Sequence, residues 1–138
     1  MNKLTIRFDG GCRPTNPGNK YGSYEVTLNG RQISLVSRME LGHGTNNEAE
    51  FQILNRALGW VVEQISMAGN TPDDFILELF TDSTIVVNRL TGKYNKCKSE
   101  AQKRMAECSS HCLKYMVRFK SFHVQWNSRE YNVQRFGH

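Results

Sequence analysis

Residues 3–11 read KLTIRFDGG. Apolar and polar side chains alternate along this stretch, which is typical of a β-strand with one buried face. The alternation runs into a carboxylate, Asp9, and then into two glycines. Residues 76–83, ILELFTDS, end in the same way at Asp82. Two apolar strands that each present an aspartate at their end predict a shared site if the strands are neighbours.

The composition is that of one globular domain, which we expect to span residues 1–138. Hydrophobic residues at 38% and charged residues at 22% argue against a disordered chain. No window approaches the run of about 20 apolar residues that spans a bilayer. The first strand also begins too early to leave room for a signal peptide. The net charge of +5 favours a polyanionic partner.

The cysteines predict a reducing compartment, the cytoplasm, because their spacing fits neither a disulfide framework nor a zinc site. Cys108 and Cys112 share one face of a predicted helix and are expected to be core sulfur atoms. His111 lies about 100° away from that face, so we expect no metal site there. We also expect a monomer, since nothing in the sequence favours an oligomer.

Hydrophobic periodicity and turn residues divide the chain into strands and helices. The strands are predicted at residues 3–9, 23–28, 31–39, 75–81 and 117–126. The helices are predicted from Thr45 or Asn46 to about Ala68, at 83–90, at 98–115 and in the tail at 128–138. Asn29 and Gly30 predict a tight hairpin between the second and third strands. The glycine-rich and proline-rich segment 10–22 is expected to be an irregular loop.

This order predicts an α/β fold, a five-stranded mixed sheet with helices packed on it. In such sheets, ligands bind beyond the carboxyl ends of the parallel strands. If the first and fourth strands are adjacent and parallel, Asp9 and Asp82 lie close together. Two such anions repel each other unless a cation lies between them, and Mg²⁺ commonly binds carboxylates.

A third acid is expected from the start of the first helix, at Glu48 or Glu50. These residues are two positions apart and lie on different faces of the helix, so only one can point toward the aspartates. A purely structural interpretation remains open for each acid alone, with the aspartates capping a turn and a helix and the glutamates in solvent.

Three motifs, taken together, resemble type 1 ribonuclease H. They are FDGGCRPTNPG at residues 8–18, TNNEAE at residues 45–50 and FTDS at residues 80–83. The resemblance selects Glu50 over Glu48. It implies an endonuclease that cuts the RNA strand of an RNA–DNA hybrid with two Mg²⁺ or Mn²⁺ ions, leaving 5′-phosphate and 3′-hydroxyl ends. Asp9, Glu50 and Asp82 would be the catalytic metal ligands, with Asp9 between the two ions.

The resemblance also implies a set of hybrid-contacting residues. They are Gly10, Gly11, Asn16, Thr45, Asn46, Asn47, Lys93 and Arg129. Asparagine amides both donate and accept hydrogen bonds, which suits the 2′-hydroxyls and base edges of a shallow minor groove. Glycine lets the backbone approach the RNA closely. Lys93 opens a basic run that ends at Arg104 and would attract phosphates in a salt-sensitive way. Such a run is also typical of a solvated surface.

The C-terminal sequence, REYNVQRFGH, departs from the family pattern, which usually supplies a fourth acid. The position of that acid falls on Phe136, whose benzyl group cannot bind a hard cation. We expect Phe136 to be buried and Gly137 to end the helix in a left-handed turn. That turn would bring His138 to the site as the fourth catalytic and metal ligand, with Asn132 and Glu130 as alternatives.

The missing acid leaves a second interpretation open, in which the chain is a catalytically weakened module that binds RNA–DNA hybrids or double-stranded RNA. A third is another nuclease on the same fold, although the TNN motif and the glycines of the first motif argue against it. With His138 as a ligand, an imidazole in place of a carboxylate would favour Mn²⁺ over Mg²⁺.

Overall fold

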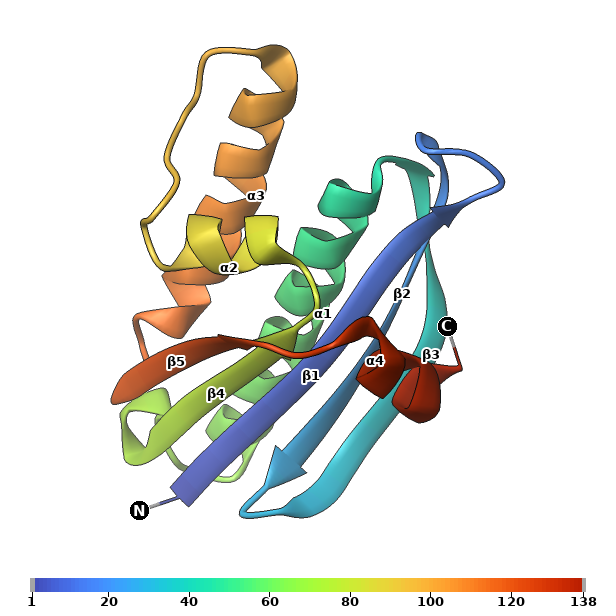
Figure 1. Ribbon diagram of the computed structural model, residues 1–138. Coiled ribbons are helices and arrows are strands. Elements are labelled where there is room, and N and C mark those ends of the chain that lie inside the picture. The colour runs from blue at the N-terminus through green and yellow to red at the C-terminus, as the bar shows by residue number, and fades with distance from the viewer. Residues whose placement is uncertain (1, 138) are drawn as a thin grey trace.

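The computed structural model describes residues 2–137, which form a five-stranded mixed sheet with helices on both faces (Figure 1). The strands are β1 (Asn2–Arg13), β2 (Gly18–Leu28), β3 (Arg31–Gly44), β4 (Phe75–Thr81) and β5 (Ser121–Trp126). The helices are α1 (Asn46–Met67), α2 (Thr84–Leu90), α3 (Glu100–Met116) and α4 (Arg129–Phe136), with a short 3₁₀ turn, η1 (Pro72–Asp74), before β4. The predicted fold class is confirmed.

The strand order is β3-β2-β1-β4-β5. The first three strands pair antiparallel, whereas β4 pairs parallel with both β1 and β5. Asn29 and Gly30 both have positive φ, 51° and 86°, as a tight β2–β3 hairpin requires. The predicted adjacency of the first and fourth strands is therefore confirmed, and their carboxyl ends meet at one edge of the sheet.

The core lies between α1 and the sheet. Strand β1 turns its alternate apolar side chains toward α1, whose own apolar stripe is buried. The largest fully buried side chains are Phe8, Phe51, Ile6, Ile53, Leu54, Leu58, Leu77, Leu79, Met116, Val26, Val61 and Val86. Among residues 2–137, each helix is too short or too polar to cross a lipid bilayer.

Helix α4 lies against the opposite face of the sheet from α1 (Figure 1). The Arg135 guanidinium donates to both carboxylate oxygens of the buried Glu25, each at 2.8 Å, and its Nε donates to the Tyr131 hydroxyl at 2.7 Å. Phe136 is 6% exposed, and Gly137 ends the helix with a left-handed φ of 75°. Both predictions for the helix end are confirmed.

Four predicted strand boundaries are wrong by four or more residues. Strand β2 begins at Gly18 rather than at 23, and β3 continues to Gly44 rather than ending at 39, because Gly18 and Gly44 are paired. Strand β1 continues to Arg13 instead of stopping at residue 9, because the glycine-rich segment pairs with β2 as far as Arg13 opposite Asn19. Only residues 14–17 form the connection. Strand β5 begins at Ser121 rather than at 117, because the backbone N–H groups after α3 are used in turn hydrogen bonds to that helix.

Candidate active site

Three carboxylates from separate parts of the chain lie together at the carboxyl ends of β1 and β4. The parallel pairing of Arg7 with Phe80 brings Asp9 and Asp82, two residues further on, to the same edge of the sheet. Glu50 reaches this edge from near the start of α1. One ligand oxygen from each of these three side chains lies within 4.8 Å of the other two. We call Asp9, Glu50 and Asp82 the acidic cluster.

A tight contact between α1 and β1 positions Glu50. Thr45 caps α1 by accepting a hydrogen bond from the Glu48 backbone N–H at 3.2 Å. Gly10 faces the helix, and a β-carbon there would lie 2.7 Å from the backbone nitrogen of Glu50. The absence of a side chain at Gly10 therefore lets the start of α1 lie directly on the strand that carries Asp9.

Asp82 is held where β4 leads into α2. The Ser83 hydroxyl caps α2 by accepting a hydrogen bond from the Val86 N–H at 3.2 Å. The indole N–H of Trp126, at the end of β5, donates to the Asp82 carbonyl oxygen at 3.0 Å. These contacts fix the backbone on either side of a side chain that is only partly buried.

Burial and mutual repulsion disfavour full ionisation of the acidic cluster. Burial raises the pKa of the Glu50 carboxyl well above its usual range, and the charges of Asp9 and Asp82 raise it further. Burial, and then the charge of Asp9, raise the pKa of Asp82. The side chains of Asn132 and Arg129 partly offset that rise by favouring the ionised form of Asp82. A cation among the carboxylates would remove the repulsion.

The acidic cluster fits a divalent cation by its donor chemistry. Its ligand atoms are all carboxylate oxygens, which Mg²⁺ and Mn²⁺ bind in proteins. Within residues 2–137, no other group of three or more His, Cys, Asp or Glu side chains lies close enough together to hold a metal ion. The donor set and the raised pKa values point to the same site.

Replacing Glu50 with glutamine is expected to stabilise the metal-free protein, increasingly so as the pH rises toward neutral. The folded chain binds the Glu50 proton more tightly than the unfolded chain does. The stability that protonated Glu50 contributes to the folded state is therefore fully present below the ordinary pKa of 4.5. It is lost as the pH rises through the raised pKa, because the folded protein must then hold a buried charge at Glu50. Melting temperatures in EDTA, from acidic to neutral pH, would measure this against the exposed control Glu63→Gln. A constant difference in melting temperature between the wild type and Glu50→Gln across this pH range would contradict the expectation.

A depression of about 300 Å³ surrounds the acidic cluster. The other lining residues are Gly10, Gly11, Cys12, Tyr21, Asn46, Asn47, Ser83 and Arg129. Five of the predicted hybrid contacts are among them, namely Gly10, Gly11, Asn46, Asn47 and Arg129. The other three, Asn16, Thr45 and Lys93, are not part of this lining.

Asn16 and Thr45 support the start of α1. The Asn16 side-chain oxygen accepts a hydrogen bond from the Asn46 N–H at 3.2 Å, which joins the β1–β2 connection to the helix. The Cys12 thiol donates to the Asn46 side-chain oxygen at 3.1 Å. The Thr45 hydroxyl is engaged with Glu48, both as the cap and as a donor to its carboxylate at 3.2 Å. These contacts hold Asn46 at the depression.

Cys12, Tyr21 and Ser83 line the depression although the sequence does not predict them as contacts. Gly11 and Tyr21 are paired across β1 and β2, and a β-carbon at Gly11 would lie 2.8 Å from the Tyr21 hydroxyl. A sequence-based prediction of this pair would have required residues 10–22 to be assigned as strands. A loop has no register that places a tyrosine opposite a glycine.

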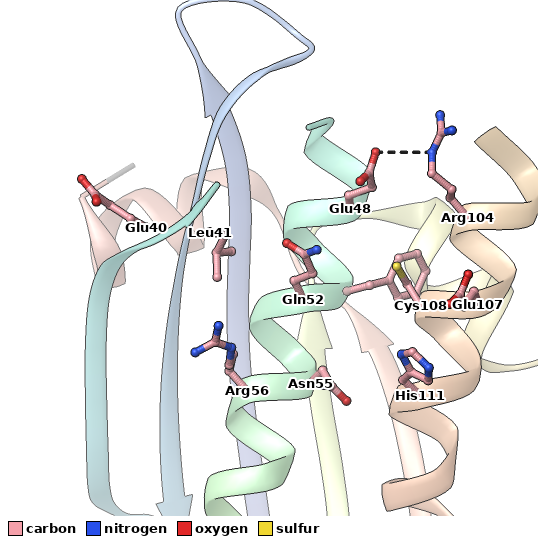
Figure 2. A pocket seen from close by; sticks show the side chains of 11 residues that line it. Glu40, Leu41, Glu48, Gln52, Asn55, Arg56, Arg104, Glu107, Cys108 and His111 are labelled. Carbon is pink, nitrogen blue, oxygen red and sulfur yellow. Dashed lines mark ion pairs between the residues drawn. The ribbon is translucent and has the colours of Figure 1, made fainter. Parts of the chain in front are cut away.

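A larger depression, of about 500 Å³, lies between β3, α1 and α3, and none of the acidic cluster lines it (Figure 2). Figure 2 shows Glu48 at this depression, directed toward Arg104 of α3, with 3.8 Å between the Glu48 Oε1 and Arg104 Nε atoms. The buried Lys20 ammonium lies 4.0 Å from the other Glu48 oxygen. Glu48 is therefore paired with cations, whereas Glu50 joins the aspartates.

The residues considered for the fourth ligand position differ in their surroundings. Asn132 is 1% exposed; its side-chain oxygen accepts from Asn127 Nδ2 at 3.1 Å. The buried Asn132 Nδ2 atom makes no close hydrogen bond in the described part of the chain, although the Asn132 side chain lies near enough to favour the ionised form of Asp82. Glu130 is exposed. His138, the favoured ligand, lies outside the described residues.

Residues 7–134 match the sequence pattern of the reverse transcriptase-like family. No curated protein sequence matches the chain at a significant level. Among solved structures, RNase H1 from the halophilic archaeon Halobacterium salinarum NRC-1 is similar with 24% identity and a TM-score of 0.74, covering 94% of this chain and 89% of that one.

LC11-RNase H1, isolated from compost by a metagenomic approach, has 28% identity and a TM-score of 0.74, with 97% of this chain and 90% of that chain covered. The structure of LC11-RNase H1 in complex with an RNA/DNA hybrid has 26% identity and a TM-score of 0.70, with coverages of 95% and 89%. The family match spans residues 7–134, and the TM-scores of 0.74 and 0.70 show that LC11-RNase H1 shares the fold of this chain. The chain therefore belongs to the reverse transcriptase-like family and has the type 1 ribonuclease H fold.

Proposed function

We propose that this chain is a metal-dependent endoribonuclease that hydrolyses the RNA strand of RNA–DNA hybrids and leaves 5′-phosphate and 3′-hydroxyl ends. The observation that carries the proposal is the approach of the Asp9, Glu50 and Asp82 oxygens to within 4.8 Å of one another at the carboxyl edge of the sheet. The hybrid bound by LC11-RNase H1, a structure with the same fold, supports the choice of substrate.

The acidic cluster would hold two Mg²⁺ or Mn²⁺ ions, with Asp9 as the ligand shared between them. When bound, such a pair activates a water nucleophile and stabilises the leaving 3′ oxygen. The chain itself contributes preorganisation, since the cap at Thr45 and the close approach at Gly10 fix Glu50 before any ligand arrives.

The depression around the acidic cluster suits the minor groove of a hybrid. Asn46 and Asn47 present amides beside the acids, and amides can bond both 2′-hydroxyls and base edges. Gly10 and Gly11 also line the depression, but the space beside their α-carbons is taken by α1 and by the Tyr21 hydroxyl, so their glycine character serves packing. Arg129, which also lines the depression, would bind a phosphate near the scissile bond.

Replacing His138 with alanine is expected to reduce cleavage in Mn²⁺ by about 10-fold or more if His138 is the fourth ligand. It should also lessen a preference for Mn²⁺ over Mg²⁺, because imidazole favours the softer ion. Steady-state rates in each metal, for wild type and variant, would measure both effects. The matched control is His123→Ala, on the exposed part of β5. An unchanged rate and metal preference in the His138 variant would remove this residue from the mechanism.

A second candidate function is a binding module for RNA–DNA hybrids or double-stranded RNA with weak turnover. The observation that favours it is the burial of Phe136 where the family pattern has an acid. A gel assay with labelled hybrid, double-stranded RNA, single-stranded RNA and duplex DNA, each with Mg²⁺, Mn²⁺ or EDTA, separates the two functions. Cleavage of the hybrid that occurs with Mg²⁺ or Mn²⁺ but not with EDTA supports the nuclease. Binding of the hybrid without cleavage in either metal supports the binding module.

We place the enzyme in the cytoplasm and expect it to act as a monomer. All four cysteines are free thiols, which fits a reducing compartment. The acidic cluster is assembled from a single chain, so cleavage would require no second copy.

A further inference from the structure

The connection between α2 and α3 carries a concentration of positive charge. Its cations, together with those of the first turns of α3, are Lys93, Lys96, Lys98, Lys103 and Arg104. Residues 94–98 have no regular secondary structure, so the hydrogen bonds of a helix or sheet do not fix their backbone. Figure 1 shows this connection rising beside α3 at the same end of the molecule as the start of α1.

A buried arginine holds the connection from inside. Arg89, in the last turn of α2, is 6% exposed. Its guanidinium donates to the Lys96 carbonyl oxygen at 2.6 Å and to the Gln102 carbonyl oxygen at 3.5 Å. It also lies 4.8 Å from the centre of the Tyr94 ring, a favourable cation–π contact. One side chain thus links α2, the connection and α3.

The Gln102 side chain completes this arrangement. Its oxygen accepts from the backbone N–H groups of Lys98 and Ser99, at 2.9 and 3.1 Å, and its nitrogen donates to the Tyr94 hydroxyl at 3.1 Å. With Ser99 it also forms a capping box at the start of α3. We call Arg89, Tyr94 and Gln102 the connection cluster.

The connection is also tied to the proposed active site. Arg104, in the second turn of α3, pairs with Glu48 in the first turn of α1. The Glu48 carboxylate in turn accepts a hydrogen bond from the Thr45 hydroxyl at the helix cap. These contacts join α3 to the start of α1, where Asn46 and Asn47 line the depression.

We propose that the connection cluster is a positioning device that holds the lysines of residues 93–98 in one arrangement for binding the phosphates of a nucleic acid strand. The inference rests on the proposed function, and the cluster itself touches no substrate. Ordering a flexible lysine-rich segment on binding costs affinity, so a segment ordered in advance binds phosphates more tightly with the same charge. The role of Arg89 is internal, because the side chain is buried and its Nη2 group donates to two backbone oxygens.

The test uses Gln102→Ala and Arg89→Lys, the second of which keeps the net charge. Binding of a fluorescent RNA–DNA hybrid is measured by anisotropy in EDTA over a series of salt concentrations. We expect Kd to rise about 3- to 10-fold in either variant at low salt, the cost of ordering a few freed side chains. The plot of log K against log salt should become shallower, because fewer phosphates are contacted. Hydrogen exchange at residues 93–98 should become faster.

The matched control is Gln64→Ala, an exposed position near the far end of α1, which should leave Kd unchanged. Circular dichroism establishes that each variant is folded at the assay temperature. An unchanged Kd and salt slope in both folded variants, or unchanged exchange at residues 93–98, would overturn the proposal. Since binding is measured without metal, a wild type that binds but does not cleave would reject the nuclease and leave this inference standing.

Discussion

Replacing Asp9 with asparagine is expected to lower kcat for hybrid cleavage by about 1,000-fold or more, the loss of several kcal/mol of metal-derived transition-state stabilisation. Asp9 lies close to the other two acids, and its charge raises the pKa of both Glu50 and Asp82. An amide there removes one ligand charge that two cations would share. Single-turnover cleavage of a labelled hybrid, with Mg²⁺ or Mn²⁺ at saturation, measures the effect.

Metal binding gives a second measurement for Asp9→Asn. A ligand at 100 times its Kd stabilises a folded protein by about 2.7 kcal/mol, so Mn²⁺ should raise the melting temperature of the wild type and have less effect on the variant. The control is the same substitution at Asp73, which is exposed in η1. Wild-type cleavage by Asp9→Asn, or equal stabilisation of the two proteins by Mn²⁺, would place the metal elsewhere.

Replacing Gly10 with alanine is expected to damage both stability and activity. The new β-carbon would meet the backbone of α1, 2.7 Å from the carbonyl carbon of Ala49 and from the nitrogen of Glu50. Backbone cannot rotate aside as a side chain can, so the helix must move away from β1. Overpacking of this kind costs about 1–3 kcal/mol, and the displacement separates Glu50 from Asp9. We expect the cleavage rate to fall about 100-fold, as a misplacement of about 1 Å can cause.

Thermal unfolding and single-turnover rates of the folded variant measure the two effects of Gly10→Ala separately. Gly59→Ala is the matched control, since it lies within α1 and its new β-carbon would make only an ordinary contact of 3.4 Å with the Tyr115 hydroxyl. Alanine in a helix interior should stabilise that variant by about 0.5–1 kcal/mol. A Gly10→Ala protein as stable and active as the wild type would show that α1 tolerates a side chain at this contact.

The sequence was most informative where one periodicity persisted without interruption. Strand β4 is found at the predicted residues, because its short run of mostly apolar residues is bounded by the turn residues of 69–74 and by Ser83. The choice of Glu50 over Glu48 also agrees with the structure, since residues two apart on a helix face different directions. The resemblance to ribonuclease H made that choice; the periodicity alone left both glutamates possible.

Glycine and long-range pairing limited what could be predicted. The extension of β1 to Arg13 could not be found, because glycines carry no hydrophobic pattern and the segment pairs through its backbone. An arginine is expected at the surface from its residue type. Arg89 is nevertheless buried, because the connection after α2 turns back over it and accepts its hydrogen bond at the Lys96 carbonyl. The pair between Arg135 and Glu25 joins residues 110 positions apart, a distance at which no local pattern operates.

The parallel pairing of β1 with β4 has a consequence during synthesis. At about 5–20 residues per second, a ribosome would complete β1 several seconds before it reached Asp82, and the first three strands would wait with one side of β1 open. That open side is a template for pairing with another nascent chain. Over the same interval the acidic cluster would lack Asp82, so the proposed nuclease would be inactive while its chain is still being made.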